Sequence, residues 1–464
     1  MAEYEIPRQR HEGTPLRKFL LVLLLIVVLV AGGLTWFVTR KPVSPFDNVA
    51  AAQAPSEQLL QQGEYVARLG DCVACHSTPK SAPFSGGLEM GTPLGSIFTT
   101  NITPDKETGI GNYTLADFDR AVRHGVARDG QRLYPAMPYP SYVKMSDDDI
   151  RALYAYFMNR VEPVHRASKS SDIKWPLNMR WPLALWNAVF TEPGTYQPKT
   201  AGNDSWNRGA YLVQGPGHCG SCHTPRAITM AEKALDESSP LYLSGALLDG
   251  WYAPSLRADP NTGLGRWSEE DIYAFLKNGR NEHGVVFGSM ADAFNNSTQF
   301  MSDDDLRAIS HYLKSLPGDP ARDGTPWQYV EATANSPSVP AGQQNPGAQT
   351  FLAKCSFCHG IDGRGKAPWI PPLAGSTSSL AKENASQINV TLNGSGRVVA
   401  SGIPDAYRMP PFRQQLSDQQ VADVLTFVRS SWGNHGGPVV ADDVKALRAH
   451  TDPASSSPIV LQMR

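Results

Sequence analysis

Six cysteines, arranged in three copies of one pattern, constrain this 464-residue chain more than any other feature. In each copy two residues separate the cysteines and a histidine follows at once: Cys72, Cys75 and His76; Cys219, Cys222 and His223; Cys355, Cys358 and His359. Two thiols placed this way on a helical turn can add to the two vinyl groups of one haem, and the histidine then supplies an imidazole to the iron. Free thiols, disulfides and zinc are the alternatives, but the three copies use every cysteine. The motifs predict three covalently bound haem c groups.

The second axial ligand decides whether each iron carries electrons or reacts with a substrate, because a second strong ligand closes the iron. Met137 and Met409 each stand directly before a proline, which stiffens the loop that would hold the sulfur. Met290 occupies the equivalent stretch of the second repeat without a proline, whereas Met145 and Met301 precede Ser-Asp-Asp-Asp and are better explained as apolar staples at a helix start. The predicted ligand pairs are His76 and Met137, His223 and Met290, and His359 and Met409.

The motifs recur about every 140 residues, an interval that favours tandem domains over a short solenoid repeat. The preceding sequence repeats as well, because Gly63 stands two residues before Tyr65 and Gly209 two residues before Tyr211. Capping boxes are predicted where a hydroxyl residue is followed three positions later by Asp or Gln: Thr114, Ser146, Ser268, Ser302 and Ser417. Behind the last of these in each domain, apolar residues follow the spacing of an amphipathic helix, and no alternating pattern predicts strands.

An apolar run from Phe19 to Thr39 is long enough to span a bilayer as a helix. A cleaved signal peptide is the alternative, but the run exceeds a typical signal core and the nearest suitable small residues, Ala52 and Ala54, lie well beyond it. The basic residues before the run outnumber those after it: Arg8, Arg10, Arg17 and Lys18 against Arg40 and Lys41. The short N-terminus is therefore expected in the cytoplasm and the haem domains on the periplasmic side, with one anchor.

The predicted fold class is all-α, with three tandem cytochrome c-type haem domains after an N-terminal transmembrane helix. The expected segments are a cytoplasmic N-terminus (1–18), the anchor (19–39), domain 1 (55–165), a Trp-rich connector (166–204), domain 2 (205–318), a linker (319–344), domain 3 (345–434) and a polar C-terminal tail (435–464). Within the connector, Trp175 to Phe190 is dense in apolar residues. It is interpreted either as a strap packed on or between domains or as a docking surface for a partner subunit.

Composition excludes some classes of function. A net charge of -2 gives no basic field for nucleic acid, and 40 Gly with 37 Pro indicate much loop, which fits domains whose core is partly porphyrin. No nucleotide-binding glycine motif, nucleophile elbow or metalloprotease signature occurs, so chemistry on an organic substrate is expected in a partner. The alternatives are a haem enzyme such as a c-type peroxidase, which would need a displaceable ligand at Met290, and a cytochrome c subunit of a terminal oxidase.

From about Gly63 to Trp432 the chain resembles the tri-haem cytochrome c subunit of membrane-bound bacterial dehydrogenases that oxidise alcohols, aldehydes or sugar acids. The stretches that carry the resemblance are Gly63 to Leu69, Asn101 to Asp105, Tyr134 to Tyr139, Trp175 to Trp186, Gly215 to Arg226 and Pro371 to Gly375. The resemblance implies that electrons pass from a catalytic subunit of the pyrroloquinoline quinone (PQQ), flavin or molybdopterin type to ubiquinone in the bacterial inner membrane. The spanning N-terminal helix departs from those subunits, which commonly have a cleaved signal.

Overall fold

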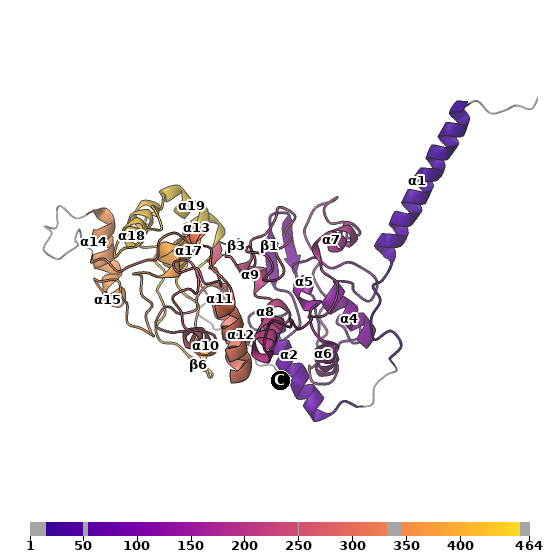
Figure 1. Ribbon diagram of the computed structural model, residues 1–464, viewed down its shortest axis with the longest axis horizontal. Coiled ribbons are helices and arrows are strands. Elements are labelled where there is room, and N and C mark those ends of the chain that lie inside the picture. Colours follow the sequence, from indigo (N-terminus) through magenta and orange to yellow (C-terminus); the bar gives the residue numbers. More distant parts are fainter. Residues whose placement is uncertain (1–14, 50–53, 249, 332–344, 455–464) are drawn as a thin grey trace, which may run out of the picture.

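The structure is a computed structural model that describes residues 15–49, 54–248, 250–331 and 345–454 (Figure 1). Its helices form three groups along the chain. The first group has α2 (Glu57–Leu69), α3 (Cys72–Cys75), α4 (Leu115–His124), α5 (Tyr139–Tyr142) and α6 (Asp147–Asn159), and α7 (Pro182–Phe190) follows it. The second has α8 (Asp204–Gln214), α9 (Gly220–His223), α10 (Glu269–Asn278), α11 (Ser289–Asn296), the 3-10 helix η1 (Thr298–Phe300) and α12 (Asp303–Ser315), and α13 (Pro320–Asp323) follows. The third has α14 (Pro346–Lys354), α15 (Ser356–His359), α16 (Thr377–Leu380), α17 (Ala385–Asn393), α18 (Asp418–Ser430) and α19 (Ala441–His450).

Each group also carries one short antiparallel hairpin. β1 (Glu89–Thr92) pairs with β2 (Gly95–Phe98), β3 (Ala246–Leu248) with β4 (Trp251–Ala253), and β5 (Val399–Ala400) with β6 (Ile403–Pro404). The fold is therefore rich in helix, as expected, but the all-α class omits these hairpins. They contain two to four residues a strand, which is too short for an alternating pattern to show in the sequence.

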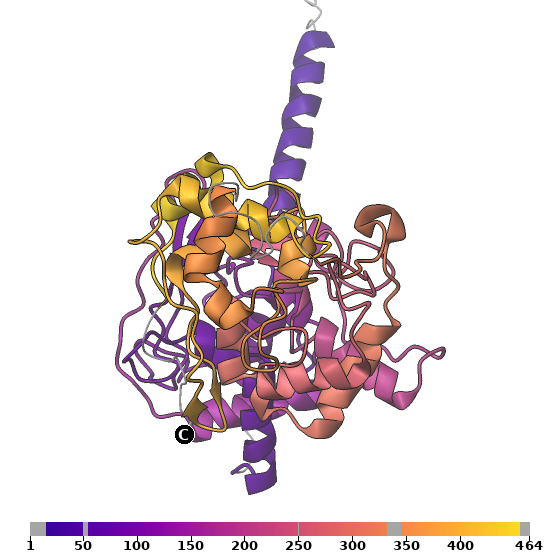
Figure 2. The same cartoon turned by 90° about the vertical axis from the view of Figure 1, so that its left-hand side faces the viewer.

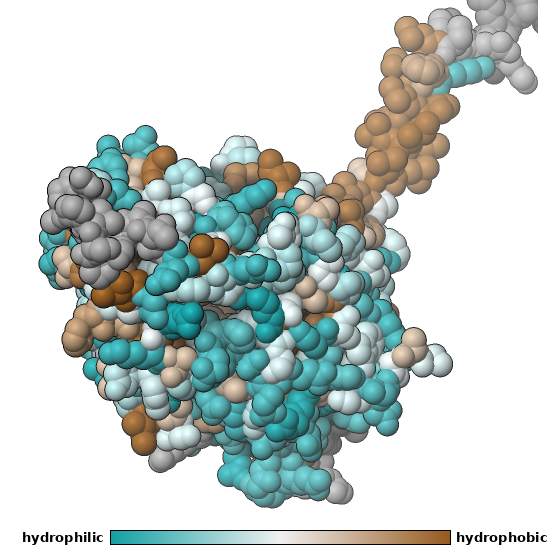
Figure 3. All heavy atoms as spheres, turned by 60° about the vertical axis from the view of Figure 1, so that its left-hand side comes forward, coloured by the Kyte–Doolittle hydropathy of each residue, from teal (hydrophilic) through white to brown (hydrophobic). Residues whose placement is uncertain are grey.

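One long helix, α1 (Pro15–Thr39), projects from the rest of the molecule as a single rod (Figures 1 and 2). Its side chains from Leu16 to Trp36 are all exposed, and Figure 3 shows the rod as almost wholly hydrophobic. Among the described residues it is the one helix long and apolar enough to cross a membrane. At its end, Arg132 Nη2 donates to the Arg40 carbonyl (3.0 Å) and Lys41 Nζ donates to the Arg128 carbonyl (2.6 Å). These bonds attach the rod to the first helix group.

A close helix crossing recurs in all three groups. The helix before each motif packs on the last long helix that follows the ligand loop: α2 on α6, α8 on α12, and α14 on α18. A β-carbon on Gly63 would lie 2.0 Å from the Ala152 carbonyl oxygen, and one on Gly209 would lie 2.0 Å from that of Ala308. Gly347 has the same contact with Asp423, at 2.1 Å. Only glycine permits these backbones to approach so closely, so each motif is held against the core of its own group.

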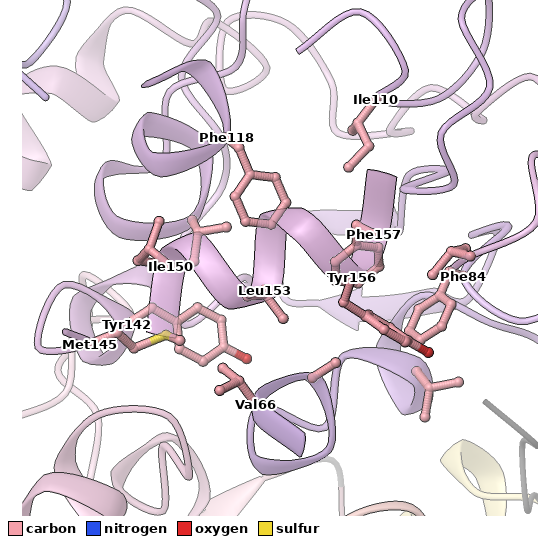
Figure 4. Packing of buried hydrophobic residues seen from close by; sticks show 14 of the residues in the cluster. Val66, Phe84, Ile110, Phe118, Tyr142, Met145, Ile150, Leu153, Tyr156 and Phe157 are labelled. Carbon is pink, nitrogen blue, oxygen red and sulfur yellow. The ribbon is translucent and has the colours of Figure 1, made fainter. Parts of the chain in front are cut away.

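The hydrophobic core of the first group lies between these helices (Figure 4). Ile150, Leu153 and Phe157 on α6 are buried, which confirms the amphipathic spacing predicted for that helix. Met145 is 1% exposed and lies beside Ile150 and Tyr142 in Figure 4. Met301 is buried in the same position of the second core. Both methionines therefore act as the predicted apolar staples.

Three of the five predicted capping boxes are confirmed, at Thr114, Ser268 and Ser417. At Ser146 and Ser302 the prediction of a box was wrong, because only half of it forms. Each serine hydroxyl accepts from the amide three residues on, but the carboxylates of Asp149 and Asp305 bind other side chains instead. These two carboxylates take part in a contact between helix groups that is described below.

Two segments expected to be peripheral pack on the helix groups. α19, within the expected polar tail, contacts α17 and α18 and buries Val444 completely. In the expected linker, the indole of Trp327 donates to the Trp432 carbonyl (3.0 Å). The linker residues 332–344, the end of the tail at 455–464, and Arg8 and Arg10 lie outside the described residues.

We expect Gly63→Ala to lower the free energy of unfolding by about 1–3 kcal/mol, because the added methyl group would force α2 away from the Ala152 carbonyl. Denaturant unfolding followed by far-UV circular dichroism measures the loss. Gly91→Ala in β1 is the control, because a β-carbon there would meet nothing within 4 Å. Equal stability of the two variants would contradict the role of the crossing.

Candidate functional site

All three Cys-x-x-Cys-His motifs fold as a single helical turn. In each turn the amide of the histidine donates to the carbonyl of the first cysteine at 3.0 Å, from His76 to Cys72, His223 to Cys219 and His359 to Cys355. The structure has no disulfide among these six cysteines. The turn therefore keeps two thiols and one imidazole together in each group, as the sequence predicts.

The three histidine rings share one orientation. Nδ1 hydrogen-bonds to a backbone carbonyl of a following loop, namely Thr100 for His76 (2.7 Å), Pro254 for His223 (2.7 Å) and Pro371 for His359 (3.0 Å). A carbonyl only accepts, so the proton lies on Nδ1 and the lone pair on Nε2. Burial lowers the pKa of each ring, against the opposite effect of that hydrogen bond. Each ring is therefore a neutral imidazole with one nitrogen ready to bind a metal.

Four of the six cysteines are held as neutral thiols by burial. Burial raises the pKa of Cys72, Cys75 and Cys219 to about 12, and that of Cys355 to about 11. Zinc would require thiolates converging on one point. Among the described residues no three Cys, His, Asp or Glu side chains are grouped so that they could hold a metal ion. Thiols beside a separate imidazole fit haem attachment better than a zinc site.

The predicted methionine ligands are placed in two different ways. Met137 lies at the margin of the same hydrophobic core as Cys72, and Met409 at the margin of the same core as Cys355. Met290 lies in the first turn of α11, in a small cluster with Val398 of the third group, whereas Cys219 belongs to the main second core. The structure thus brings Met137 and Met409 into the core of their motifs but does not do so for Met290.

Unpartnered polar atoms near the ligand loops support the fit of a porphyrin. Arg132 Nε and Tyr134 Oη, a few residues before Met137, are buried without a hydrogen-bond partner, and so is Arg397 Nε on the loop that leads to Met409. Burying such donors unpaired is costly. A porphyrin carries two carboxylates that would accept from them, so the residues present fit the group that the motifs predict.

The first two motifs lie next to each other, which the sequence did not reveal. Cys75 and Cys222 are close enough to interact electrostatically. Tyr142 of α5 donates to the Gly70 carbonyl at 2.8 Å, and its ring meets the His218 ring edge to face, with centroids 5.5 Å apart. His218 therefore packs between two candidate attachment sites.

Asp71, directly before the first cysteine, is a second residue that sequence reasoning missed. Its backbone has a φ of 46° and its Oδ1 is buried without a partner. Burial, reinforced by the negative charge of Asp292, raises the pKa of Asp71 well above its usual value. Its carboxyl group therefore holds its proton more tightly than that of an exposed aspartic acid. No local pattern marks it, because its burial arises from α11 of the second group packing on α3.

A reciprocal pair of contacts joins the first and second groups. Tyr65 of α2 donates to Asp305 Oδ2 of α12 (2.7 Å) and accepts from the Ser302 amide (3.1 Å). Tyr211 of α8 in turn donates to Asp149 of α6 and accepts from the Ser146 amide (3.2 Å). These are the repeated tyrosines of the sequence, and each reaches the helix cap of the other group.

Asp305 is the more strongly bound of the two carboxylates. Arg208 contacts it with Nε at 2.7 Å and Nη2 at 2.8 Å, a two-pronged arrangement. Burial acts to raise the pKa of Asp305, but the bonds from Arg208 and Tyr65 outweigh it and lower the pKa below its usual value. Asp305 is thus an ionised anchor at the joint between the first two attachment sites.

The third group joins the second through different residues. Tyr252 of β4 and Ser386 of α17 exchange two hydrogen bonds, at 2.8 and 3.1 Å. Arg280 donates to Asp405 at 2.5 Å and stacks its guanidinium over the Trp369 ring, 3.8 Å from the centroid. All three groups are consequently bound into one body.

Comparison with known proteins agrees with this geometry. The cytochrome c family model matches residues 344–432. The chain is 50% identical over 416 residues to the cytochrome c subunit of alcohol dehydrogenase (quinone) from Gluconacetobacter polyoxogenes, covering 88% of this chain and 89% of that one. It is 48% identical to the corresponding subunit of Gluconobacter oxydans (88% and 86% covered). It is 49% identical over 410 residues to the gluconate 2-dehydrogenase cytochrome c subunit of Pantoea cypripedii (87% and 92% covered).

We expect Tyr65→Phe to loosen the joint between the first two groups. Loss of the hydroxyl removes a bond to a carboxylate, so the free energy of unfolding should fall by about 1–3 kcal/mol. The Ser302 amide should also exchange its hydrogen faster, because it loses its acceptor. Hydrogen–deuterium exchange with mass spectrometry measures this.

Tyr196→Phe is the matched control for that substitution. It also removes a tyrosine hydroxyl, one that donates to Asn207 (2.9 Å) and does not reach Ser302. Unchanged exchange at Ser302 in Tyr65→Phe, or equal acceleration in both variants, would show that the tyrosine does not hold the joint.

Proposed function

The chain belongs to the family of cytochrome c subunits of membrane-bound dehydrogenases, and it is an electron-transfer protein. From this premise we propose that it holds three covalent haems c and carries electrons from a catalytic dehydrogenase subunit to ubiquinone in the bacterial inner membrane. The observation that carries the proposal is the same turn in three places, where two thiols accompany an imidazole whose Nδ1 binds a backbone carbonyl.

Covalent attachment would use the six cysteines. Each thiol adds across one vinyl group, so that its sulfur bonds to one carbon and its hydrogen goes to the other. Cys72 and Cys75, Cys219 and Cys222, and Cys355 and Cys358 would each hold one porphyrin in this way. A bound haem supplies an iron that exchanges one electron between its ferrous and ferric states. With one haem at each cysteine pair, the chain would contain three tandem cytochrome c-type domains with the boundaries 55–165, 205–318 and 345–434.

The axial ligands would close each iron to substrates. His76, His223 and His359 present neutral rings fixed by their Nδ1 bonds. Met137 and Met409 stand in loops that are held on both sides of the sulfur. The Met137 amide donates to Tyr134 and its carbonyl accepts from Tyr139, while the Met409 amide and carbonyl both bind Ser395. Met290 is the proposed ligand of the second iron, because it occupies the equivalent stretch of the second repeat. Thioether ligands favour the ferrous state and raise the potential.

The partners follow from the relatives. They are subunits of dehydrogenases that act on an alcohol or on gluconate, so a catalytic dehydrogenase subunit is the proposed donor, of the PQQ, flavin or molybdopterin type. Two of these relatives belong to an enzyme named as quinone-linked, which supports ubiquinone as the acceptor. All three relatives are subunits of dehydrogenase complexes, and none favours the alternative of a peroxidase.

The proposed location is the inner membrane, with α1 as the anchor and the haem domains on the periplasmic side. α1 has the length and composition of a span, and its exposed side chains have no cover within the described structure. The excess of basic residues before the span supports a cytoplasmic N-terminus. Attachment of haem on the outer face agrees with that orientation.

Intact-mass spectrometry of the protein purified from its membrane tests the cofactor count. We expect the polypeptide plus three haems, and one haem fewer in a Cys355→Ala/Cys358→Ala variant. The catalytic subunit should co-purify, and the complex in liposomes should reduce ubiquinone with its substrate. A wild-type mass with fewer than three haems would contradict the attachment sites, whereas a full complement without quinone reduction would contradict only the acceptor.

Met290→Ala tests the proposed ligand of the second iron, with Met301→Ala as its matched control. We expect the first variant to lose the part of the near-infrared methionine-to-iron band that belongs to the second iron. Met301 is 4% exposed, so Met301→Ala should keep the whole band but lower stability by about 2–5 kcal/mol. Magnetic circular dichroism measures the band. A full band in Met290→Ala would remove this methionine from the ligand set.

A further inference from the structure

The strap of residues 175–190, which ends in α7, presents hydrophobic side chains to the outside. Six of them are at least 37% exposed: Trp175, Leu177, Met179, Trp181, Leu185 and Val189. Trp181, Leu185 and Val189 are spaced four residues apart, so they form one stripe of α7. Ala184, directly before Leu185, is only 4% exposed. The helix is apolar over most of its surface, and its outer side presents an apolar stripe that faces away from the protein.

The outward stripe is not the result of a loosely attached segment. Asn187 accepts from the Tyr139 hydroxyl at 2.8 Å and donates to the His124 carbonyl at 3.2 Å. The indole of Trp186 donates to the Thr229 carbonyl at 2.9 Å. The inner side of α7 is therefore fixed to the first and second groups, and the outer side is held in the orientation that exposes it.

The strap lies at the level where α1 leaves the folded part. α7 contacts α1, and Figure 1 shows it beside the end of that helix. Arg180 of the strap donates to the Arg132 carbonyl (3.0 Å), while Arg132 Nη2 donates to the carbonyl of Arg40, directly after the span (3.0 Å). One loop thus holds both the strap and the end of the span.

The composition of the strap fits a bilayer interface. Between 175 and 190 the single charged residue is Arg180, and its guanidinium packs over the Tyr134 ring, 3.5 Å from the centroid. Trp36 and Phe37 stand at the end of the span, and Trp175 and Trp181 stand on the strap beside it. Tryptophans at this level are typical of the boundary between lipid headgroups and acyl chains.

We propose that the strap is a second membrane contact, which inserts its apolar stripe into the outer interface of the bilayer beside α1. This inference rests on the membrane span proposed above. A partner protein could also cover an apolar stripe, but the shared level of strap and span favours lipid. Through Arg180 and Tyr134 the strap also contacts the loop that carries Met137, so the strap is connected to the first candidate attachment site.

Lipid photo-crosslinking tests the contact. The full haem-loaded chain is placed in nanodiscs containing a phospholipid with a diazirine in its acyl chain, irradiated, digested and analysed by mass spectrometry. We expect lipid adducts on peptides of α1 and of the strap. Ile403 is the internal control, because it is 73% exposed and belongs to β6, which lies far from α1 in Figure 1. In a Leu185→Ser/Val189→Ser variant the yield of lipid adducts on the strap should fall at least about five-fold, and the yield on α1 should stay the same.

The outcomes separate this inference from the function. Adducts on α1 without adducts on the strap would overturn the strap proposal and leave the span intact. Adducts on neither would show that α1 itself is not in the bilayer. In a third outcome, the strap gives no more lipid adducts than Ile403 and is shielded from solvent only when the catalytic subunit is added. That result would make the strap a protein docking surface.

Discussion

The close contact between glycine and a neighbouring helix backbone is the constraint on which the three candidate sites depend. Each motif begins within a few residues of the helix that carries this glycine, so the crossing fixes where the turn of cysteines and histidine lies. A second constraint comes from the other side, where a loop carbonyl holds the Nδ1 of the histidine. One constraint places the thiols and the other orients the ring, and a covalently bound planar group needs both.

The first two repeats contact each other through equivalent residues, which a single domain could not do. Tyr65 and Tyr211 stand at the same position of the first two repeats, and each binds the helix cap of the other group. The carboxylates of Asp149 and Asp305 therefore leave their own capping boxes half formed. The third repeat has Gln349 at the tyrosine position, and there the box at Ser417 is complete. A loss in local helix capping thus accompanies a gain in attachment between the first two groups.

Local features were predictable from the sequence, and contacts between groups were not. The motifs, the amphipathic helices and the staples at Met145 and Met301 depend on residues a few positions apart, and the structure confirms them. The packing of α19 on α17 and the approach of Cys75 to Cys222 depend on residues distant in the sequence, whereas the three hairpins are local but have strands too short to leave an alternating pattern. The half-formed boxes fall between these cases, because the hydroxyl half of each box formed as the local pattern predicts, while a distant tyrosine competed for the carboxylate. The raised pKa of Asp71 was equally hidden from the sequence, because it depends on burial by a helix more than 200 residues away.

A single spanning helix does not by itself fix the height or tilt of the domains that follow it. Here the chain leaving the span is bound at once, by Arg132 to the Arg40 carbonyl and by Lys41 to the Arg128 carbonyl. Because the loop with Arg132 also leads to Met137, the orientation of the span is transmitted to the first candidate site within a few residues. The proposed transfer of electrons to a lipid-soluble quinone would need such a fixed approach to the membrane surface. The short connection between Lys41 and the first helix group supplies it without a second spanning helix among the described residues.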